Sequence, residues 1–383
     1  MNIGLVINQL DPRAGGVEQW TCQFARSLSD AGHEVHVVAQ RFSAEAQNLN
    51  IVRHTIADAR SRIEFAEQAE RKLRFLGLDV VHDTGAGWHC DIFQPHGGAR
   101  AASFEQNLLL MPRWSRPWKR RLASALPRYR EFDQLSRKQY ADDGRMVLAL
   151  SQMVACDLER FHGVRPDRIR IVYNGVDTDR FSPDREIEHR VAVRRQLKLW
   201  DEVLLLIVAH NFELKGVPTL LKTMGRLTAQ GKRFHLAIAG GKKLKPYQRM
   251  AEACGATSAV TFLGPVDDPA PYYAAADIYV QPTFYDPCSL VVLEALASGL
   301  PVITSRYNGA GELLTSGREG YVLDDPSDVD EMLECLDALA DPAARVRCGH
   351  NARRLALDHT WEHNTQEIVS LYRQIAPGYR MAA

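Results

Sequence analysis

Residues 278–304 read IYVQPTFYDPCSLVVLEALASGLPVIT, and this stretch decides the expected fold. An apolar run at 278–281 is followed by a turn-rich segment, and an apolar segment of helical length then continues through Ala297. Gly299 and Pro301 separate this helix from a second apolar run, because neither residue continues a helix well. A strand, a helix and a strand in this order form the repeating unit of a parallel sheet.

The same alternation of strands and helices runs through the rest of the chain. The first half opens with the apolar run Ile3–Asn8, a turn-rich stretch and the segment Val17–Ala31, whose apolar residues recur at helical spacing. Its further strands are expected at Glu34–Ala39, Val52–Ile56, Val80–His82, Ile92–Gln94 and Met146–Leu150. The second half is expected to hold strands at Val203–Ala209, Phe234–Ala239, Val260–Leu263, Ile278–Gln281, Val302–Thr304 and Tyr321–Leu323. The pattern predicts an α/β protein with two Rossmann-like, doubly wound domains.

We expect the boundary between these domains where the pattern restarts. The N-terminal domain is assigned residues 1–168, and the C-terminal domain is assigned residues 169–360, with a strand at Ile169–Tyr173 as its first element. The last segment, 361–383, contains an expected helix at Trp361–Ile375 with an apolar stripe. This helix is expected to pack back on the N-terminal domain.

Composition excludes several classes of protein. Of the 383 residues, 45% are hydrophobic and 25% are charged, which is ordinary for globular proteins and unlike disordered chains. Lys and Arg number 47, as do Asp and Glu, and the lack of net charge argues against a nucleic-acid partner. No apolar run approaches the ~18–20 residues that span a bilayer. Seven scattered cysteines without a CxxC pair, and an N-terminus without a basic region, favour a cytoplasmic protein with reduced thiols.

Motifs for common cofactors are missing. No G-x-G-x-x-G follows the first expected strand, which argues against nicotinamide and flavin cofactors. G-x-x-x-x-G-K-S/T, G-x-S-x-G and H-E-x-x-H are also absent, so an ATPase, a serine hydrolase and a zinc protease lack support. We therefore expect neither a cofactor nor a metal.

Two carboxylates flank the start of the helix in the opening stretch. Asp286 precedes the helix and Glu294 lies inside it, eight residues later and at most ~12 Å away at the helical rise. Ser289 is placed to cap this helix. The amide groups at the helix start suit a diphosphate, and the carboxylates suit sugar hydroxyls on either side. An ordinary helix cap beside a surface glutamate would give the same pattern.

Three glycine-containing loops follow expected strands. Gly15-Gly16 opens the first helix and lets backbone approach a ligand closely, although a tight turn would also need such glycines. Lys215-Gly216 follows a strand and offers a point charge to phosphate. His96 stands before two glycines at a strand end, where it could act as a base or bond a sugar hydroxyl, or be an ordinary loop histidine.

A basic block stands out in the first half. Pro112–Arg130 contains seven basic residues, no acidic residue and two tryptophans, Trp114 and Trp118, whose spacing predicts a shared helix face. Its three prolines predict short helical pieces. The block is either a solvated insertion or a contact with an anionic membrane or acceptor.

Taken together, these segments resemble retaining glycosyltransferases of family 4, which have the GT-B fold of two Rossmann-like domains facing across a cleft. The likeness covers nearly the whole chain, and Leu290–Ile303 is its most specific part. The other segments that carry it are Gly15–Glu18, Ser151 with the helix after it, Val172–Asp177, Lys215–Gly216, Ala239–Gly241, Phe262–Gly264 and Tyr272–Asp277. The sequence YDPCSLVVLEAL is similar to the corresponding segment of lipopolysaccharide-core glucosyltransferases.

The resemblance implies roles for particular residues. The implied catalytic residues are His96, Lys215 and Asp286. The implied donor-binding residues are Gly15, Gly16, Asn211, Lys215, Gly240, Asp286, Cys288, Ser289, Leu290 and Glu294. The expected acceptor-binding residues are Glu18, His96, Arg113, Trp114 and Trp118, of which the last three are chosen from the charge and tryptophan content of the basic block. The family usually has glutamate where this chain has Asp286, and arginine where it has Asn211. One positive charge at the diphosphate is therefore missing or supplied elsewhere.

The implied reaction is transfer of a hexose from a nucleotide-diphosphate sugar, UDP- or GDP-linked, to a glycan or lipid-linked acceptor such as lipopolysaccharide. The basic block 112–130 would then touch the inner face of the cytoplasmic membrane. A GT-B epimerase or phosphorylase, or an inactive protein that only binds sugar nucleotides, remains an alternative.

Overall fold

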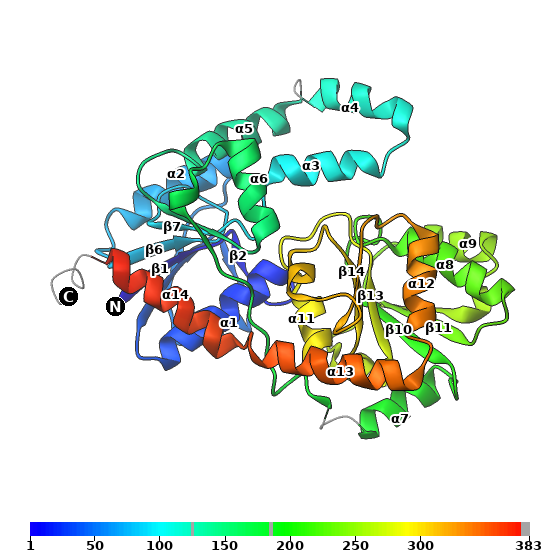
Figure 1. The fold of residues 1–383 in the computed structure, drawn as a ribbon. Coiled ribbons are helices and arrows are strands. Elements are labelled where there is room, and N and C mark those ends of the chain that lie inside the picture. Colours follow the sequence, from blue (N-terminus) through cyan, green and yellow to red (C-terminus); the bar gives the residue numbers. More distant parts are fainter. Residues whose placement is uncertain (124–125, 184–186, 377–383) are drawn as a thin grey trace. The chain divides into compact units, whose positions relative to one another are not determined.

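The computed structural model describes residues 1–123, 126–183 and 187–376. The chain divides into two compact units (Figure 1). The N-terminal unit comprises Met1–Tyr173 together with the chain from Trp361 onward, and the C-terminal unit comprises Asn174–Thr360. Each unit is built on its own parallel sheet covered by helices, so the predicted fold class of two Rossmann-like units is confirmed.

A seven-stranded parallel sheet forms the centre of the N-terminal unit, in the order β5-β3-β1-β6-β7-β8-β9. These strands are β1 (Asn2–Val6), β3 (Glu34–Ala39), β5 (Val52–Thr55), β6 (Val80–Asp83), β7 (Ile92–Phe93), β8 (Met146–Ala149) and β9 (Ile169–Ile171). A separate pair is formed by β2 (Gln9–Leu10) and β4 (Arg41–Phe42). Chain order reverses between β1 and β6, which pair with Ile3 opposite Val80. Open parallel sheets bind ligands beyond the strand ends at such a reversal.

Helices lie on both faces of this sheet, whereas α3 and α4 extend away from it (Figure 1). The helices of the unit are α1 (Gly16–Asp30), α2 (Arg62–Leu73), α3 (Arg100–Leu109), α4 (Arg116–Ala123), α5 (Pro127–Gln139), α6 (Gln152–His162) and α14 (Trp361–Ile375), with short 3₁₀ turns η1 (Ala46–Asn48), η2 (Arg113–Ser115) and η3 (Pro166–Arg168). On α1, Trp20, Phe24 and Leu28 follow each other at one-turn spacing and are fully buried. This spacing places them on the one face that packs into the core.

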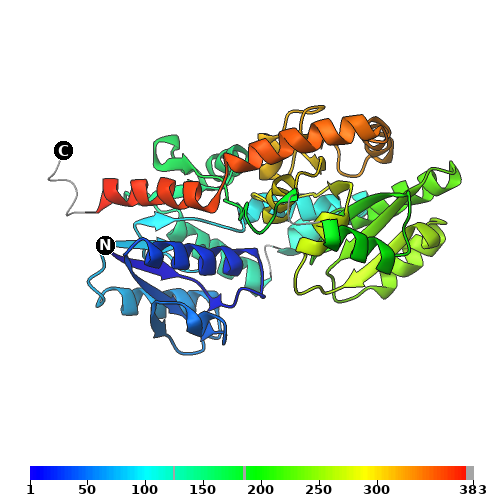
Figure 2. The same cartoon turned by 90° about the horizontal axis from the view of Figure 1, so that it is seen from below.

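The last helix belongs to the N-terminal unit. In Figures 1 and 2, α14 runs alongside α1, and residues of both helices share one hydrophobic core. The Tyr372 hydroxyl forms a 2.6 Å hydrogen bond with Nδ1 of His82 at the end of β6. The helix thus has the bounds expected from its apolar stripe and packs on the N-terminal unit. Residues 377–383 lie outside the described part of the chain.

The C-terminal unit has a six-stranded parallel sheet, in the order β12-β11-β10-β13-β14-β15. Its strands are β10 (Val203–Val208), β11 (Phe234–Ala239), β12 (Val260–Gly264), β13 (Ile278–Gln281), β14 (Val302–Ser305) and β15 (Gly320–Leu323). Its helices are α7 (Ile187–Gln196), α8 (Val217–Ala229), α9 (Lys245–Ala253), α10 (Ala270–Ala275), α11 (Leu290–Ala297), α12 (Val329–Ala338) and α13 (Pro342–Leu357), with 3₁₀ turns η5 (Thr257–Ala259) and η6 (Gly309–Leu313). Strand β10, VLLLIV, is apolar throughout because both faces of a parallel sheet are covered.

The strand expected at Ile169–Tyr173 lies in the N-terminal unit and not in the C-terminal unit. The sequence placed Ile169–Tyr173 at the start of the second domain, but β9 pairs with β8 in the N-terminal sheet. The amide of Val172 continues this pairing to the carbonyl of Ala149, and Val172 is buried in the N-terminal core. The boundary therefore lies after Tyr173, not between residues 168 and 169.

Candidate functional site

Two loops meet at the strand-order reversal of the C-terminal sheet. Strands β10 and β13 are neighbours, so the loops that follow them, 209–216 and 282–289, lie at the same edge. The carbonyl of Leu214 accepts the amide of Phe284 at 2.8 Å and the hydroxyl of Thr283 at 3.1 Å. Gly216 has φ +77°, and a Cβ there would lie only 2.1 Å from the carbonyl oxygen of Pro282. The two loops are therefore fixed to each other through their backbones.

This loop pair brings together Lys215 and Asp286, which the sequence predicts as catalytic. Nζ of Lys215 lies 2.5 Å from Oδ2 of Asp286, and both side chains are mostly buried, with exposed fractions of 20% and 13%. Gln281 donates to the same carboxylate oxygen at 3.2 Å. The amide and carbonyl of Asp286 are also bonded, to Tyr307 and Gly309. The backbone thus fixes the carboxylate, while the lysine would have to leave it to bind an anion.

The predicted cap of α11 is wrong in one respect. Ser289 stands at the N-cap position, but its side chain makes no bond to the amides of the helix. Its hydroxyl is instead hydrogen bonded to the side chain of Gln281, and its own amide donates to Oδ1 of Asn308 at 3.3 Å. The helix N-terminus is left without a side-chain cap, and such an end attracts anions through its amide groups and dipole.

Glu294 is a buried residue, not a surface glutamate. Its exposed fraction is 5%, and its Oε2 accepts a 2.9 Å hydrogen bond from the hydroxyl of Tyr273. Burial, followed by the charge of Glu294, raises the pKa of Tyr273 well above its usual value. Tyr273 therefore stays protonated and donates. This excludes the alternative of an ordinary cap beside a solvent-facing glutamate.

Cys288 contributes backbone, not thiol chemistry. Its side chain is buried, and burial raises the pKa of the thiol to about 12. The amide group of Asn174 donates to the carbonyl of Cys288 at 2.7 Å. This bond holds the segment that leads into Leu290, the first residue of α11.

Asn211 and Gly240 shape the neighbouring loops. Oδ1 of Asn211 accepts the amide of Leu214 at 3.2 Å, which closes the turn that ends at Lys215. Gly240, after β11, has φ +97°, and a Cβ there would lie 2.2 Å from the carbonyl oxygen of Ala209. Both residues therefore have a structural role at the sheet edge where the donor was predicted to bind.

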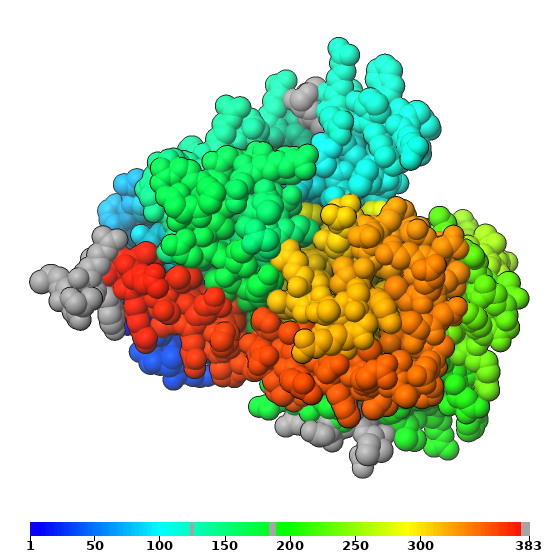
Figure 3. All heavy atoms as spheres, in the orientation of Figure 1, coloured from blue at the N-terminus to red at the C-terminus, as the bar shows by residue number. Residues whose placement is uncertain are grey.

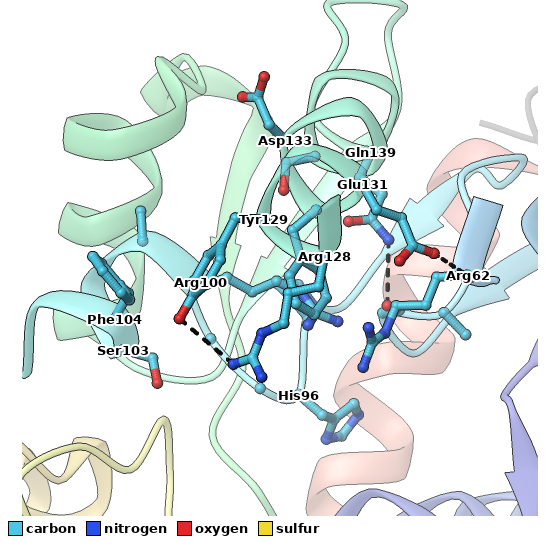
Figure 4. A pocket seen from close by; sticks show the side chains of 18 of the residues that line it. Arg62, His96, Arg100, Ser103, Phe104, Arg128, Tyr129, Glu131, Asp133 and Gln139 are labelled. Atoms are coloured by element: carbon cyan, nitrogen blue, oxygen red, sulfur yellow. Dashed lines mark hydrogen bonds between the residues drawn. The ribbon is translucent and has the colours of Figure 1, made fainter. Parts of the chain in front are cut away.

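A cavity of about 1460 Å³ occupies the corresponding edge of the N-terminal sheet (Figure 4). Its wall includes Glu18 on α1, Thr84 after β6 and His96 after β7. Burial raises the pKa of Glu18. Gly15 and Gly16 stand at the N-terminus of α1, which no side chain caps. The structure therefore brings two of the predicted acceptor residues, Glu18 and His96, to one cavity.

His96 is neutral at physiological pH. Burial, with a smaller effect of His82, lowers its pKa to about 3. Its Nε2 lies 3.2 Å from Oε1 of Gln94, and its ring lies 4.4 Å from that of Trp20 between centroids. An imidazole with so low a pKa is a weak base. Of the two roles considered, a hydrogen bond to a sugar hydroxyl therefore fits better than proton abstraction.

The cavity also has lining residues that sequence reasoning missed. They are cationic or aromatic side chains from three helices, namely Arg62, Arg100, Phe104, Tyr129 and Phe132. Arg62 and Arg100 open α2 and α3. The signal in the sequence is an arginine directly after a turn-rich segment, which is too common to be specific.

The remaining predicted acceptor residues do not line this cavity. Trp114 and Trp118 are 78% and 65% exposed and belong to different elements, η2 and α4, so they do not share one helix as predicted. Arg113 also lies outside the cavity wall, whereas Lys119 and Arg128 of the same block line it. The prolines do divide the block into short pieces, and Figure 3 shows the segment with α4 at the surface. Residues 124–125 lie outside the described part.

Comparison with known families decides the class of protein. The family described as Glycosyltransferase Family 4 matches residues 14–180, and the family described as Glycosyl transferases group 1 matches residues 191–355. The two matches follow each other and cover most of both units. The chain belongs to the GT-B glycosyltransferases. The enzyme is therefore a transferase, as the sequence predicted.

Several relatives resemble this glycosyltransferase over much of its length. A D-inositol 3-phosphate glycosyltransferase of Corynebacterium jeikeium is 29% identical over 71% of this chain and 70% of its own. A GDP-mannose-dependent alpha-(1-6)-phosphatidylinositol monomannoside mannosyltransferase of Mycolicibacterium smegmatis is 27% identical over 94% and 95%. The lipopolysaccharide glucosyltransferase WaaG of Escherichia coli is 27% identical over 67% of each chain.

Solved structures show the same fold. A crystal structure of WaaG aligns with a TM-score of 0.80 at 21% identity, covering 98% of this chain and 100% of its own. Anabaena Alr3699/HepE in complex with UDP-glucose aligns with a TM-score of 0.74 at 16% identity, covering 98% and 100%. Among residues 1–123, 126–183 and 187–376, no helix combines the length and apolarity needed to cross a membrane.

Proposed function

We propose that this glycosyltransferase transfers a hexose from a UDP- or GDP-linked sugar to a glycan or lipid-linked acceptor of the cell envelope, with retention at the anomeric carbon. The observation that carries the proposal is the pairing of Lys215 with Asp286 beside the N-terminus of α11, which no side chain caps. A lysine and a helix N-terminus at one sheet edge form a site for a diphosphate.

The relatives support this choice of substrates. Their names specify GDP-mannose as a donor in one case, and D-inositol 3-phosphate, a phosphatidylinositol mannoside and lipopolysaccharide as acceptors or products. One structural neighbour holds UDP-glucose. These names favour a nucleotide-sugar donor and a polar acceptor, which is lipid-linked in some relatives, for the present enzyme.

The proposed mechanism follows from where negative charge develops. As the nucleotide diphosphate leaves the anomeric carbon, Lys215 and the first amides of α11 would stabilise the growing charge on its oxygens. To do so, Lys215 exchanges its bond with Asp286 for one with phosphate. Asp286 is then available to bind hydroxyl groups of the sugar, and Glu294 to bind those of the ribose. We propose that neither a metal nor another cofactor takes part.

A nucleotide-sugar screen with a charge-neutral variant tests this site. UDP- and GDP-sugars should raise the thermal midpoint of the full chain, and one of the two bases should act more strongly. Glu294→Gln should weaken the affinity for that donor by about tenfold or more, because a hydrogen bond to a charged group contributes about 1.5–3 kcal/mol. Glu252→Gln on the exposed face of α9 is the matched control and should leave affinity unchanged.

Equal donor affinity in wild type, Glu294→Gln and Glu252→Gln would refute this site. Donor-dependent release of nucleoside diphosphate only when a lipid or glycan acceptor is added would establish transfer. The anomeric configuration of the product, read by proton NMR, would decide between retention and inversion.

We further propose that the basic block brings the enzyme to an anionic membrane surface. Its two tryptophans are largely exposed, and so are Leu122 and Leu126. Indole rings and cations together suit the headgroup region of a bilayer. Each basic residue near such a surface contributes about 1 kcal/mol, so binding should weaken at high salt.

Vesicle cosedimentation tests the membrane contact. The double variant Trp114→Ala, Trp118→Ala should lose most binding to anionic vesicles, whereas Trp200→Ala should not. Trp200 is a suitable control because it is 83% exposed and lies in the C-terminal unit. Equal binding to neutral and anionic vesicles, or no loss of binding in the double variant, would refute the membrane contact and favour a solvated insertion.

A further inference from the structure

Three arginines on the wall of the N-terminal cavity have no carboxylate bound to their guanidinium groups among the residues that the structure describes. They are Arg62, Arg100 and Arg128. Glu131 contacts Arg62, but it accepts the backbone amide and not the side chain. Some arginines elsewhere in the same unit are paired, as Arg168 is with Asp142, whereas others, such as Arg116, bond only backbone carbonyl groups. The same wall also contains the carboxylates of Glu131 and Asp133, and the charge of Glu131 acts on Arg100, but none of the three arginines forms an ion pair among the described residues.

Two of these cations are held against one aromatic ring. The guanidinium carbons of Arg62 and Arg100 each lie 4.2 Å from the ring centroid of Phe132. Cation–π contact attracts each group to the ring but does not remove their mutual repulsion. Desolvation by the surrounding groups, and then the charge of Arg62, lower the pKa of Arg100, although the residue is solvent-exposed and the charges of Tyr140 and Glu131 act in the opposite direction. A bound anion would relieve this repulsion.

The backbone adds to the positive potential at the same place. Helix α3 begins at Arg100 and has no side-chain cap at its N-terminus. Gly97 and Gly98, which precede the N-cap residue Ala99, line the cavity. In Figure 4 the side chains of Arg62, Arg100 and Arg128 gather above His96. The uncapped positive end of a ten-residue helix and three guanidinium groups thus act on one space.

We propose that this wall binds a phosphate monoester carried by the acceptor. The inference rests on the proposed function, since it names the chemical class of the acceptor. Several guanidinium forks match the three terminal oxygens of a phosphate better than the two of a carboxylate. Neutral His96 beside this wall is then placed to bond a hydroxyl of the same acceptor molecule. The phosphate would orient the acceptor, and it would take no part in the bond-making step.

Phosphate binding to arginine variants of the full chain tests the proposal. Inorganic phosphate is titrated by calorimetry at constant ionic strength, and glucose 6-phosphate is compared with glucose. Arg100→Gln and Arg62→Gln should each weaken the binding of both phosphate probes by about tenfold or more, as expected for a lost charge-assisted bond. Arg100→Lys should recover part of it, because the charge returns without the planar fork.

Arg71→Gln is the matched control. It removes the same charge from the exposed side of α2, the helix that begins at Arg62. Thermal midpoints of all variants must match that of the wild type, and Arg62→Gln supplies a second test if Arg100→Gln does not fold. Equal phosphate affinity in wild type, Arg100→Gln and Arg62→Gln, or no phosphate binding by folded wild type, would overturn the proposal.

Two further measurements complete the test. The first distinguishes the possible sources of the phosphate, and the second distinguishes failure of this proposal from failure of the proposed function. Vesicle binding is compared in the Trp114→Ala, Trp118→Ala background, because the basic block is itself proposed to bind anionic vesicles. If this background binds glucose 6-phosphate but not phosphatidic acid vesicles, the ligand is a phosphorylated sugar or polyol. If it binds both and the arginine substitutions abolish both, the ligand is a phospholipid headgroup; both outcomes support a phosphate site. Nucleotide-sugar affinity should be the same in every variant. Phosphate binding in a chain that binds no nucleotide sugar would refute the proposed function and leave this site standing.

Discussion

The site of the C-terminal unit is drawn from a few short segments, whereas the cavity of the N-terminal unit is lined by residues spread from Ile7 to His162. In the first, backbone bonds between Leu214 and Phe284 fix the loops, and the charges of Lys215 and Asp286 neutralise each other. In the second, helices supply the wall, and several cations have no acidic partner among the described residues.

Under the two proposals, the units would bind an anion in different ways. In the C-terminal site Lys215 is paired with Asp286, and a diphosphate would have to displace this carboxylate. In the N-terminal cavity, Arg62, Arg100 and Arg128 are exposed to solvent, and the carboxylates of Glu131 and Asp133 on the same wall form no ion pair with them among the described residues. Substitutions should therefore act on geometry in the first site and on charge balance in the second.

The largest effect is expected where the loops of the C-terminal site touch. Gly216→Ala adds a Cβ that would lie 2.1 Å from the carbonyl oxygen of Pro282, at a φ of +77°. The backbone must move, so we expect a loss of about 3 kcal/mol or more in the free energy of unfolding. Because Lys215 moves with the displaced backbone of residue 216, the affinity for the donor should fall as well.

Gly231→Ala gives the comparison that isolates this contact. Gly231 has a similar φ of +69°, but a Cβ there would meet nothing within 4 Å. It should cost only about 1 kcal/mol, the ordinary penalty of alanine in the left-handed region. Chemical denaturation and donor titration of both variants measure the difference. Equal stability of the two variants would show that the loop contact does not hold the site.

Acid is expected to weaken the N-terminal unit first. Burial lowers the pKa of His82 to about 3, and that of His96 falls similarly. A lowered histidine pKa stabilises the fold above the unfolded value near 6.5 and loses that stabilisation as the pH falls toward 3. Between pH 6.5 and 4.5, protonation linked to His82 alone should lower the free energy of unfolding by about 2 kcal/mol.

One buried acid works against this trend. Burial raises the pKa of Asp83 to about 6, despite three backbone amides that donate to it. Its contribution to the free energy of unfolding increases as the pH falls from about 6 toward 4. This gain offsets about the loss caused by one of the two histidines. The net effect should still be loss of stability. Hydrogen exchange at pH 7 and 4.5 would locate it, and His82→Gln should flatten the pH dependence; an unchanged profile would contradict this account.

Much of the C-terminal site could be read from the sequence because it is nearly contiguous. Strand, turn and helix follow each other within residues 278–297, so proximity in sequence implies proximity in space. Lys215 was predicted because its loop follows an expected strand, and the structure shows that this strand is adjacent to β13. The role of Ser289 was misread because a capping residue and a residue bonded to Gln281 look alike in sequence.

The N-terminal cavity could not be read in this way. Arg62 and Arg100 are far apart in the chain, and they become neighbours only because both helices pack against Phe132 of α5. No local pattern encodes such a meeting of three helices. The tryptophans were assigned to the acceptor from the composition of the basic block and their four-residue spacing, and neither distinguishes a cavity wall from an exposed surface.

The smallest expected effect tests the internal carboxylate of the C-terminal site. Asp286→Asn keeps the shape of the side chain but removes the charge that holds Lys215. A nucleoside diphosphate would then meet an unpaired lysine, so its affinity should rise about fivefold, which matches the ~1 kcal/mol of a partly exposed ion pair. Transfer of the sugar should fall in the same variant, because its hydroxyls lose a charged acceptor. Asp337→Asn, which breaks the surface pair with Lys232 in the same unit, is the control and should change neither. Titration with UDP and GDP measures the affinity, and a fall in affinity with Asp286→Asn would show that the carboxylate assists the diphosphate instead of competing with it.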